Sequence, residues 1–120
     1  RSAWHLFMLR YNQEAFAGIP RATFLKALGA EGIRSSSGYR PLNKEPFLTQ
    51  AVLSKGYRRI YPEKLLTQWY DRNQCPVNDR LCGEAVWFTQ NMLLGPKTDM
   101  EQIAAAIAKI QAQASELRKI

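Results

Sequence analysis

Apolar and aromatic residues fill both alternating faces of residues 4–11, with the sequence WHLFMLRY. Successive side chains of a strand point to opposite sides. The two faces carry Trp4, Leu6 and Met8 on one side and Phe7, Leu9 and Tyr11 on the other. A strand that is apolar on both faces is typical of a covered sheet, so we expect helices to pack against it.

A short helix is predicted over residues 21–28. Pro20 stands just before it, where a helix tolerates proline in its first turn. We expect Gly29 or Gly32 to end the helix, because glycine adopts a positive φ at little steric cost. The inward side chains of this helix are Phe24, Leu25 and Leu28.

The middle of the chain has a weaker hydrophobic pattern. Residues 33–36 are expected to form a brief second strand. Residues 37–47 contain two prolines and a glycine, which predict an irregular loop, and ordered loops often carry function. Residues 48–70 predict short helical turns that place four side chains on the core. These are Leu65, Leu66, Trp69 and Tyr70.

Regular structure is predicted again from Pro76, which opens a helix with Val77 and Leu81 on one face. Residues 85–89 (AVWFT) are β-branched and aromatic in large part, which favours a strand. The Gly-Pro pair at residues 95–96 then interrupts the chain.

The final helix is predicted to start at Thr98, which would cap it together with Glu101 in a capping box. Its apolar seam repeats in steps of three and four and consists of Met100, Ile103, Ile107, Ile110, Ala114 and Leu117. Such a seam is expected to lie on the chain's own sheet. A helix about 30 Å long exceeds what a small sheet needs, so part of it is expected to rest on another domain or subunit.

These elements predict one domain over residues 1–120, of the α/β or α+β class, with a small sheet and flanking helices. The apolar share of 46% suits a packed core. The chain has no apolar run of about 18 residues, so no membrane span is expected. It starts without Met or a signal sequence, and we therefore expect it to be a piece of something longer.

The net charge is +7, and residues 34–59 carry its one basic stretch. We interpret this stretch as a solvated or substrate-facing surface rather than a nucleic-acid site, because basic helices with interleaved exposed aromatics are missing. Cys75 and Cys82 lie two helical turns apart, about 10 Å, too far for a disulfide unless the helix ends between them. They are expected to be buried thiols in a reducing cytoplasm, and a single histidine does not favour a zinc site.

Three stretches in sequence order resemble one known family. They are SAWHLFMLRY with the following helix and its end at AEGI, then GYRPLNKEPF at 38–47, then CPVNDRLCGEAVWFTQNMLLGP at 75–96 leading into DMEQIAAAIAKI. Together they are similar to the C-terminal portion of the DegT/DnrJ/EryC1/StrS family, aminotransferases that use pyridoxal phosphate on keto-sugars and cyclitols. The resemblance implies the small C-terminal domain of a fold type I enzyme.

In many members of this family, the loop that corresponds to residues 38–47 contains the sequence His-Tyr-x-Pro-Leu-His. Here Gly38 and Asn43 stand at the two histidines, so any acid-base role of those imidazoles is in doubt. The resemblance places this loop near the sugar, which makes Tyr39, Arg40 and Asn43 substrate-contact candidates, and His5 a further one. The alternatives are a Tyr39 that anchors the loop in the core, a solvated Arg40 and a structural His5.

In this family the Schiff-base lysine and the phosphate cradle belong to a large N-terminal domain, which the resemblance implies is missing here. The chain's lysines have surface-like surroundings and are Lys26, Lys44, Lys55, Lys64, Lys97, Lys109 and Lys119. We therefore expect no catalytic or cofactor-binding residue in this chain, and no activity from it alone. The complete enzyme is implied to be a homodimer with glutamate or glutamine as amino donor.

Three alternatives remain open at this point. A stand-alone regulatory domain that binds a small molecule has a similar architecture. A basic nucleic-acid module is the second. The third is a family member that lacks the Schiff-base lysine and is not an aminotransferase.

Overall fold

The structure, a computed structural model, describes residues 5–118. The chain divides into two compact units. The first, called the sheet unit, comprises the chain up to Gly38 and from Glu84 onward. The second, called the helical unit, is Tyr39–Gly83. The prediction of a single domain over residues 1–120 stays a prediction.

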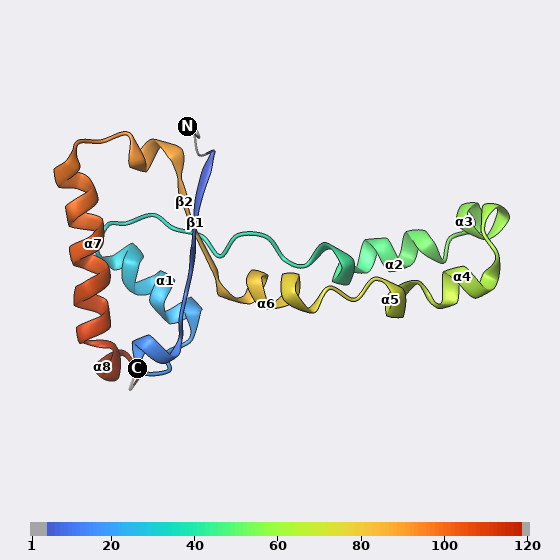
Figure 1. The fold of residues 1–120 in the computed structure, drawn as a ribbon, viewed down its shortest axis with the longest axis horizontal. Helices are drawn as coiled ribbons and strands as arrows, with labels where there is room; N and C mark the ends of the chain where they lie inside the picture. The colour runs from blue at the N-terminus through green and yellow to red at the C-terminus, as the bar shows by residue number, and fades with distance from the viewer. Residues whose placement is uncertain (1–4, 119–120) are drawn as a thin grey trace. The chain divides into compact units, whose positions relative to one another are not determined.

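The sheet unit holds both strands, and Figure 1 labels its main elements. They are β1 (Leu6–Arg10), η1 (Glu14–Phe16), α1 (Arg21–Ala30), β2 (Ala85–Thr89), η3 (Gln90–Leu93), α7 (Lys97–Ala112) and α8 (Ala114–Leu117). The helical unit consists of short helices. They are η2 (Leu42–Lys44), α2 (Pro46–Val52), α3 (Lys55–Ile60), α4 (Glu63–Thr67), α5 (Trp69–Arg72) and α6 (Pro76–Glu84), whose last residue belongs to the sheet unit.

The two strands pair antiparallel, with Leu6 opposite Thr89 and Arg10 opposite Ala85. This arrangement is compatible with the α+β class of the two that the sequence predicts. Strand β2 has the bounds expected from its β-branched and aromatic residues. Residues 33–36 do not form the expected strand: Ser36 makes a one-residue antiparallel bridge to Trp87 on β2.

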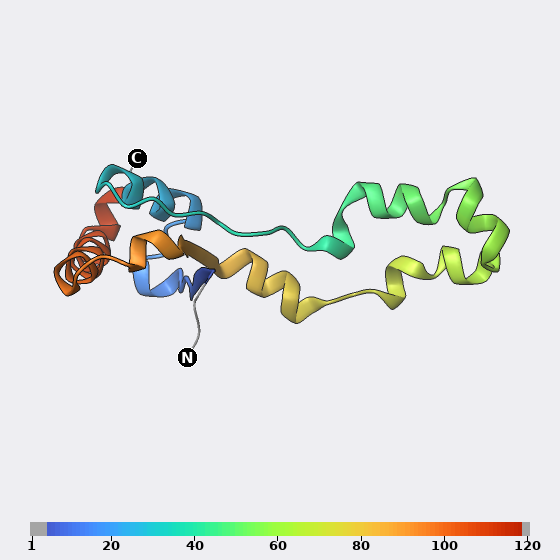
Figure 2. The same cartoon turned by 90° about the horizontal axis from the view of Figure 1, so that it is seen from above.

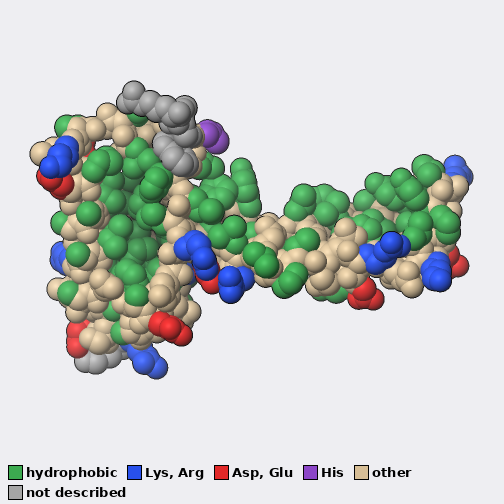
Figure 3. All heavy atoms as spheres, in the orientation of Figure 1, with side chains coloured by type: hydrophobic (Ala, Val, Ile, Leu, Met, Phe, Trp, Pro, Cys, Tyr) green, Lys and Arg blue, Asp and Glu red, His purple; other side chains and the backbone are tan. Residues whose placement is uncertain are grey.

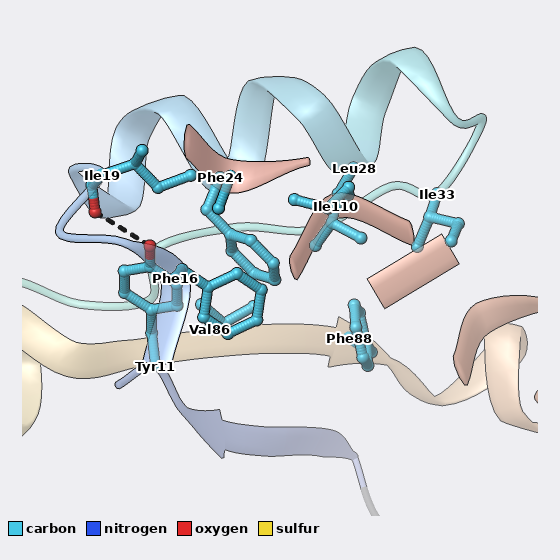
Figure 4. Packing of buried hydrophobic residues seen from close by; sticks show 10 residues of the cluster. Tyr11, Phe16, Ile19, Phe24, Leu28, Ile33, Val86, Phe88 and Ile110 are labelled. Atoms are coloured by element: carbon cyan, nitrogen blue, oxygen red, sulfur yellow. Dashed lines mark hydrogen bonds between the residues drawn. The ribbon is translucent and has the colours of Figure 1, made fainter. Parts of the chain in front are cut away.

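The core of the sheet unit lies between one face of the strands and the helices α1 and α7, which both views place on the same side (Figures 1 and 2). Aromatic rings fill its centre (Figure 4): Tyr11 stacks on Phe24 with ring centroids 4.7 Å apart, and Phe16 meets Phe24 edge-on at 4.9 Å. The buried Tyr11 hydroxyl donates a hydrogen bond of 2.9 Å to the Ile19 carbonyl. Burial raises the pKa of Tyr11 above its ordinary value.

Helix α1 confirms the predicted element and ends at a glycine as expected. Gly32 has a φ of +83°. Its N–H donates to the Gly29 carbonyl at 3.1 Å, and the Ile33 N–H donates to the Leu28 carbonyl at 2.9 Å. These two bonds are a Schellman motif, with Ile33 and Leu28 in the same buried cluster.

The core covers one face of β1, whereas the other face is covered in part, with Leu6 half-buried, against the prediction that both faces are covered. Phe7 and Leu9 pack against the core and Tyr11 belongs to it, whereas Met8 on the other face is 45% exposed. Trp4, predicted to share that face, lies outside the described residues. The pattern of residues 4–11 therefore reports apolar side chains correctly, but it does not say what covers them.

Helix α7 starts one residue before the predicted cap. Pro96 is the N-cap residue and Lys97 the first helical residue, so Thr98 lies inside the first turn and is not the cap. The seam is confirmed at its centre, where Ile110 and Ala114 are buried and Ile103 and Ile107 pack against the core. A break at Gln113 separates α7 from α8, so the seam runs over two helices rather than one.

The helical turns predicted over residues 48–70 are present, and their predicted burial is confirmed in part. Leu66 is buried and Trp69 half-buried, whereas Leu65 and Tyr70 are exposed, so the prediction was wrong for these two. Val77 on α6 is 74% exposed. Cys75 is exposed and Cys82 half-buried, so neither is a buried thiol.

Two negative findings apply to residues 5–118. Their His, Cys, Asp and Glu side chains form no group of three or more that would hold a metal ion. None of their helices combines the length and hydropathy that a membrane crossing requires.

Candidate functional site

The four candidate residues lie in two different units. Tyr39 and Arg40 open the helical unit, and Asn43 follows in η2. His5 lies just before β1 in the sheet unit and is exposed. Tyr39 is 72% exposed, so it does not anchor the loop in a core. We name residues 39–45 the 39–45 segment.

The chain just before this segment is fixed to β2 by backbone hydrogen bonds. Ser36 N–H donates to the Trp87 carbonyl at 3.1 Å, and Trp87 N–H donates to the Ser36 carbonyl at 2.9 Å. The Arg21 guanidinium adds two bonds, to the Ser37 carbonyl at 3.2 Å and to the Ala85 carbonyl at 2.8 Å. The chain is thereby held in place up to Gly38.

Gly38 has no space for a side chain. Its φ is +71°, and a Cβ there would lie 2.6 Å from Cε2 and 2.8 Å from Nε1 of the Trp87 indole. Such distances are far below van der Waals contact. The histidine that the family pattern has at this position would therefore require Trp87 to move, which gives the departure from the pattern a steric reason.

Arg40 is tied to its own segment. Its Nε lies 3.2 Å from Oε1 of Glu45, while 79% of the Arg40 side chain stays exposed. An ion pair this exposed contributes little to stability, because water screens it and the long side chain loses rotamer freedom. Most of the guanidinium therefore remains accessible to an anionic or hydroxylated ligand.

Asn43 and Lys44 connect the segment to the entrance of α6. Asn43 Nδ2 donates a hydrogen bond of 2.8 Å to the Asn73 carbonyl, and Lys44 Nζ lies 2.9 Å from Oδ2 of Asp79. The hydrogen bond with Asp79 raises the pKa of Lys44 above its ordinary value, against a smaller effect of desolvation. Asn43 Oδ1 and Asp79 Oδ1 are enclosed and accept no hydrogen bond from residues 5–118.

Most of the exposed large apolar side chains belong to the helical unit. Figure 3 shows apolar side chains along this unit and over a broad area of the sheet unit, on the face turned to the viewer. The exposed large apolar side chains of the helical unit are Tyr39, Leu42, Phe47, Leu53, Tyr57, Ile60, Tyr61, Leu65, Tyr70 and Val77. The buried apolar side chains of this unit are Val52 and Leu66. Large exposed apolar surface of this kind marks an interaction site in soluble proteins.

A shallow groove of about 530 Å³ lies in the sheet unit between the end of α1 and α7. Ile33, Met92 and Ile103 contribute apolar surface to it. An ion pair between Glu31 and Lys109, 2.8 Å long, lies at the same groove. The sequence reasoning placed no candidate residue here.

Residues 5–118 do not fit a pyridoxal phosphate site. Within residues 5–118 no lysine side chain is buried. Lys44, Lys97 and Lys109 form ion pairs with Asp79, Glu101 and Glu31. A Schiff-base lysine needs a desolvated or cationic setting that lowers its pKa, whereas the pKa of Lys44 is raised.

Asp79 and Asn73, which contact this segment, were not identified from the sequence as parts of a site, nor was Trp87, which limits the space at Gly38. Asp79 and Asn73 lie far along the chain from Asn43 and Lys44. The contacts of Asn43 with Asn73 and of Lys44 with Asp79 depend on how the helical unit folds back on itself, so no periodic pattern in the sequence predicts them. Only the acidic residue in the first turn after Pro76 marks the start of α6.

Fold and site together define a small α+β protein with an exposed, basic and aromatic segment held at both of its ends. Its sequence is similar to aminotransferases of cyclitol metabolism. It is 32% identical over 116 residues to the L-glutamine:2-deoxy-scyllo-inosose aminotransferase of Streptoalloteichus tenebrarius, covering 96% of this chain and 27% of that protein. No family model matches the chain, and no solved structure matches it significantly.

Two further relatives carry a provisional name, L-glutamine:3-amino-2,3-dideoxy-scyllo-inosose aminotransferase. The one from Streptoalloteichus tenebrarius is 30% identical over 124 residues, covering 98% of this chain and 29% of the relative. The one from Streptomyces kanamyceticus is 30% identical over 121 residues, covering 98% and 28%. The chain thus spans less than a third of the length of the curated relatives it matches.

Proposed function

We propose that this chain is the C-terminal small domain of a pyridoxal-phosphate-dependent aminotransferase of the DegT/DnrJ/EryC1/StrS family that acts on a keto-cyclitol. The observation that carries the proposal is the similarity along 96–98% of this chain to aminotransferases named for inosose substrates and L-glutamine. In this proposal the fold is the small domain of a fold type I enzyme, and the enzyme works in the cytoplasm.

The role proposed for this chain is to bind and orient the substrate. Pyridoxal phosphate, bound to the rest of the enzyme, supplies the amino-group transfer. Tyr39 and Arg40 present exposed hydrogen-bonding groups that suit the hydroxyls of a cyclitol. Asn43 and His5 complete the proposed contact set.

The proposed partners are a large N-terminal domain and a second subunit. Support comes from the relatives, of which this chain covers only 27–29%. The exposed apolar side chains of the helical unit and the uncovered face at Met8 give further support, since both suit contact with additional protein. Alone, the 120-residue chain is proposed to be inactive.

The test is an assay of the protein made from the complete coding sequence. With pyridoxal phosphate and L-glutamine, we expect it to convert 2-deoxy-scyllo-inosose to the amino-cyclitol, followed by mass spectrometry. The 120-residue chain should give no product. A complete protein that takes up the cofactor but aminates neither inosose named for the relatives would contradict the proposed substrate class.

The regulatory-domain alternative makes a different prediction. A stand-alone sensor would bind a metabolite without further protein, and calorimetry of the 120-residue chain with cyclitols and amino acids measures this directly. We expect no heat of binding, because the proposed pocket needs walls from the large domain.

A further inference from the structure

Two side chains of the 39–45 segment bind residues at the entrance of α6. The Arg40–Glu45 ion pair stays within the segment and fixes nothing outside it. The helical unit offers little core, since its buried apolar side chains are Val52 on α2 and Leu66 on α4. Out of the segment, the Asn43 side chain hydrogen-bonds the Asn73 carbonyl and Lys44 pairs with Asp79.

Both contacts end at the entrance of α6, and both acceptors there are themselves fixed. Asn73 follows α5, and its side-chain amide donates to the Trp69 carbonyl at 2.7 Å, which orients the residue. Asp79 lies in the first turn of α6, where its N–H donates to the Cys75 carbonyl at 2.9 Å. A carboxylate in this turn is also favoured by the positive end of the helix dipole.

The Lys44–Asp79 pair is less exposed than the other lysine pairs of the chain. The Asp79 side chain is 19% exposed and that of Lys44 44%, against 60% and 88% for Glu101 and Lys97 on α7. Partial burial weakens screening by water, so this pair restrains its residues more than an exposed pair does. Lys44 directly follows Asn43, so a restraint on Lys44 also restrains the Asn43 backbone.

We propose that Asp79 is a positioning residue: its carboxylate, through Lys44, holds Asn43 and the preceding Tyr39 and Arg40 in the geometry that receives the substrate. The inference rests on the proposed function for the substrate, whereas the restraint itself belongs to the helical unit. Asp79 touches no substrate in this account, and it acts through the chain that it fixes.

The first arm of the test measures the restraint in the 120-residue chain by amide hydrogen exchange. Asp79→Asn keeps the size of the side chain and its ability to accept a hydrogen bond, but removes the charge. We expect the amides of Lys44 and Glu45, which donate to the Pro41 and Leu42 carbonyls, to exchange roughly three to ten times faster, with α1 and α7 unchanged. Glu101→Gln, which breaks the exposed Lys97–Glu101 pair, is the matched control and should leave these amides unaffected.

Lys44→Met separates the ion pair from the contribution of Asp79 to α6. If Asp79 acts through Lys44, this variant speeds exchange of the amides of residues 44 and 45 as Asp79→Asn does, while the amides of α6 stay as protected as before. Unchanged exchange in the Lys44→Met variant overturns the inference. The exchanged pair Lys44→Asp with Asp79→Lys should restore part of the protection, because it restores the attraction.

The second arm uses the complete protein and compares KM with kcat. For Asp79→Asn we expect the KM for the keto-cyclitol to rise roughly tenfold, with the KM for L-glutamine within twofold of the unaltered protein. A loss in kcat alone, or equal effects on both substrates, overturns the positioning role. If the unaltered protein aminates no cyclitol, the proposed function fails, and the exchange arm alone decides whether Asp79 fixes the segment.

Discussion

The hydroxyl of Tyr11 makes a hydrogen bond inside the core, and its effect on stability can be measured in solution. Its ring belongs to the aromatic cluster, and its O–H satisfies the Ile19 carbonyl inside that cluster. The sequence predicts an inward Tyr11 from the alternation of residues 4–11. It does not predict the acceptor, because the turn that brings Ile19 back to Tyr11 has no pattern that specifies it.

The first prediction concerns the pH dependence that follows from Tyr11. The folded state holds the phenol proton more tightly than the unfolded state, because burial raises the pKa of Tyr11 above 10.0. Its contribution to the free energy of unfolding is therefore intact below about pH 10 and is lost as the pH rises toward the folded-state pKa. Tyr11→Phe should remove this fall.

Urea denaturation of the 120-residue chain at pH 8 and pH 11 measures the effect. At pH 8 Tyr11→Phe should cost about 1 kcal/mol, since it leaves the Ile19 carbonyl without its buried donor. The exposed Tyr61→Phe serves as the control and should change neither the stability nor its slope with pH. Equal pH slopes for Tyr11→Phe and the unaltered chain would show that this phenol is not the titrating group.

A second prediction at the scale of the residue uses two glycines with the same backbone conformation. Gly18 and Gly38 have φ of +77° and +71°, but a Cβ at Gly18 meets nothing within 4 Å. Gly18→Ala should therefore cost only the left-handed backbone strain, about 1–2 kcal/mol. Gly38→Ala should cost about 1–3 kcal/mol more, because it also crowds the Trp87 indole.

Thermal unfolding of the two variants gives this difference directly. Trp87→Leu, which removes the indole, should bring the cost of Gly38→Ala close to that of Gly18→Ala when the two changes are combined. Equal costs for the two glycine variants in the unaltered background would argue against crowding at Gly38. The sequence shows a glycine at position 38, where the family pattern has a histidine. The Trp87 indole, which leaves no space for a side chain there, lies on β2, far along the chain.

At the scale of the element, predictions from sequence succeed where local chemistry and tertiary packing agree. Strand β2 and helix α1 combine suitable residues with a clear end signal, and both lie where the pattern places them. The start of α7 was misplaced because Pro96 and Thr98 both carry a start signal. The fixed φ of Pro96 and its position after Gly95 place the N-cap two residues earlier than predicted, at Pro96, so that Lys97 is the first helical residue.

This displacement makes Thr98 an ordinary first-turn residue, which gives the third prediction. Thr98→Ala should change the free energy of unfolding by less than about 0.5 kcal/mol, since no cap is lost and alanine favours helix. A capping threonine would cost about 1 kcal/mol. Chemical denaturation followed by circular dichroism distinguishes the two, and a loss of the larger size would restore Thr98 as the cap.

At the scale of the whole molecule, the two units differ in how much apolar surface they bury. The sheet unit has one cluster that joins both strands to α1, α7 and α8, whereas the buried apolar side chains of the helical unit are Val52 and Leu66. The sequence does not reveal this division, because Leu65, Tyr70 and Val77 follow the same helical spacing as true core residues. The spacing of apolar residues along the sequence does not show whether another part of the protein covers these three side chains.

The fourth prediction tests whether the units differ in stability. Leu28 is fully buried at the centre of the sheet unit, so Leu28→Ala should cost about 2–5 kcal/mol and lower the protection of β1, β2, α1 and α7 together. Leu66→Ala removes a side chain of the same size from the helical unit. It should abolish protection in α2 to α5 while the sheet unit keeps its exchange rates, because the cluster of the sheet unit contains no residue of 39–83.

Hydrogen exchange with mass spectrometry resolves both patterns in one experiment. Loss of protection in the sheet unit with Leu66→Ala would mean that the two units fold as one cooperative body, and the exposed apolar side chains of residues 39–83 would then need a different explanation from contact with further protein.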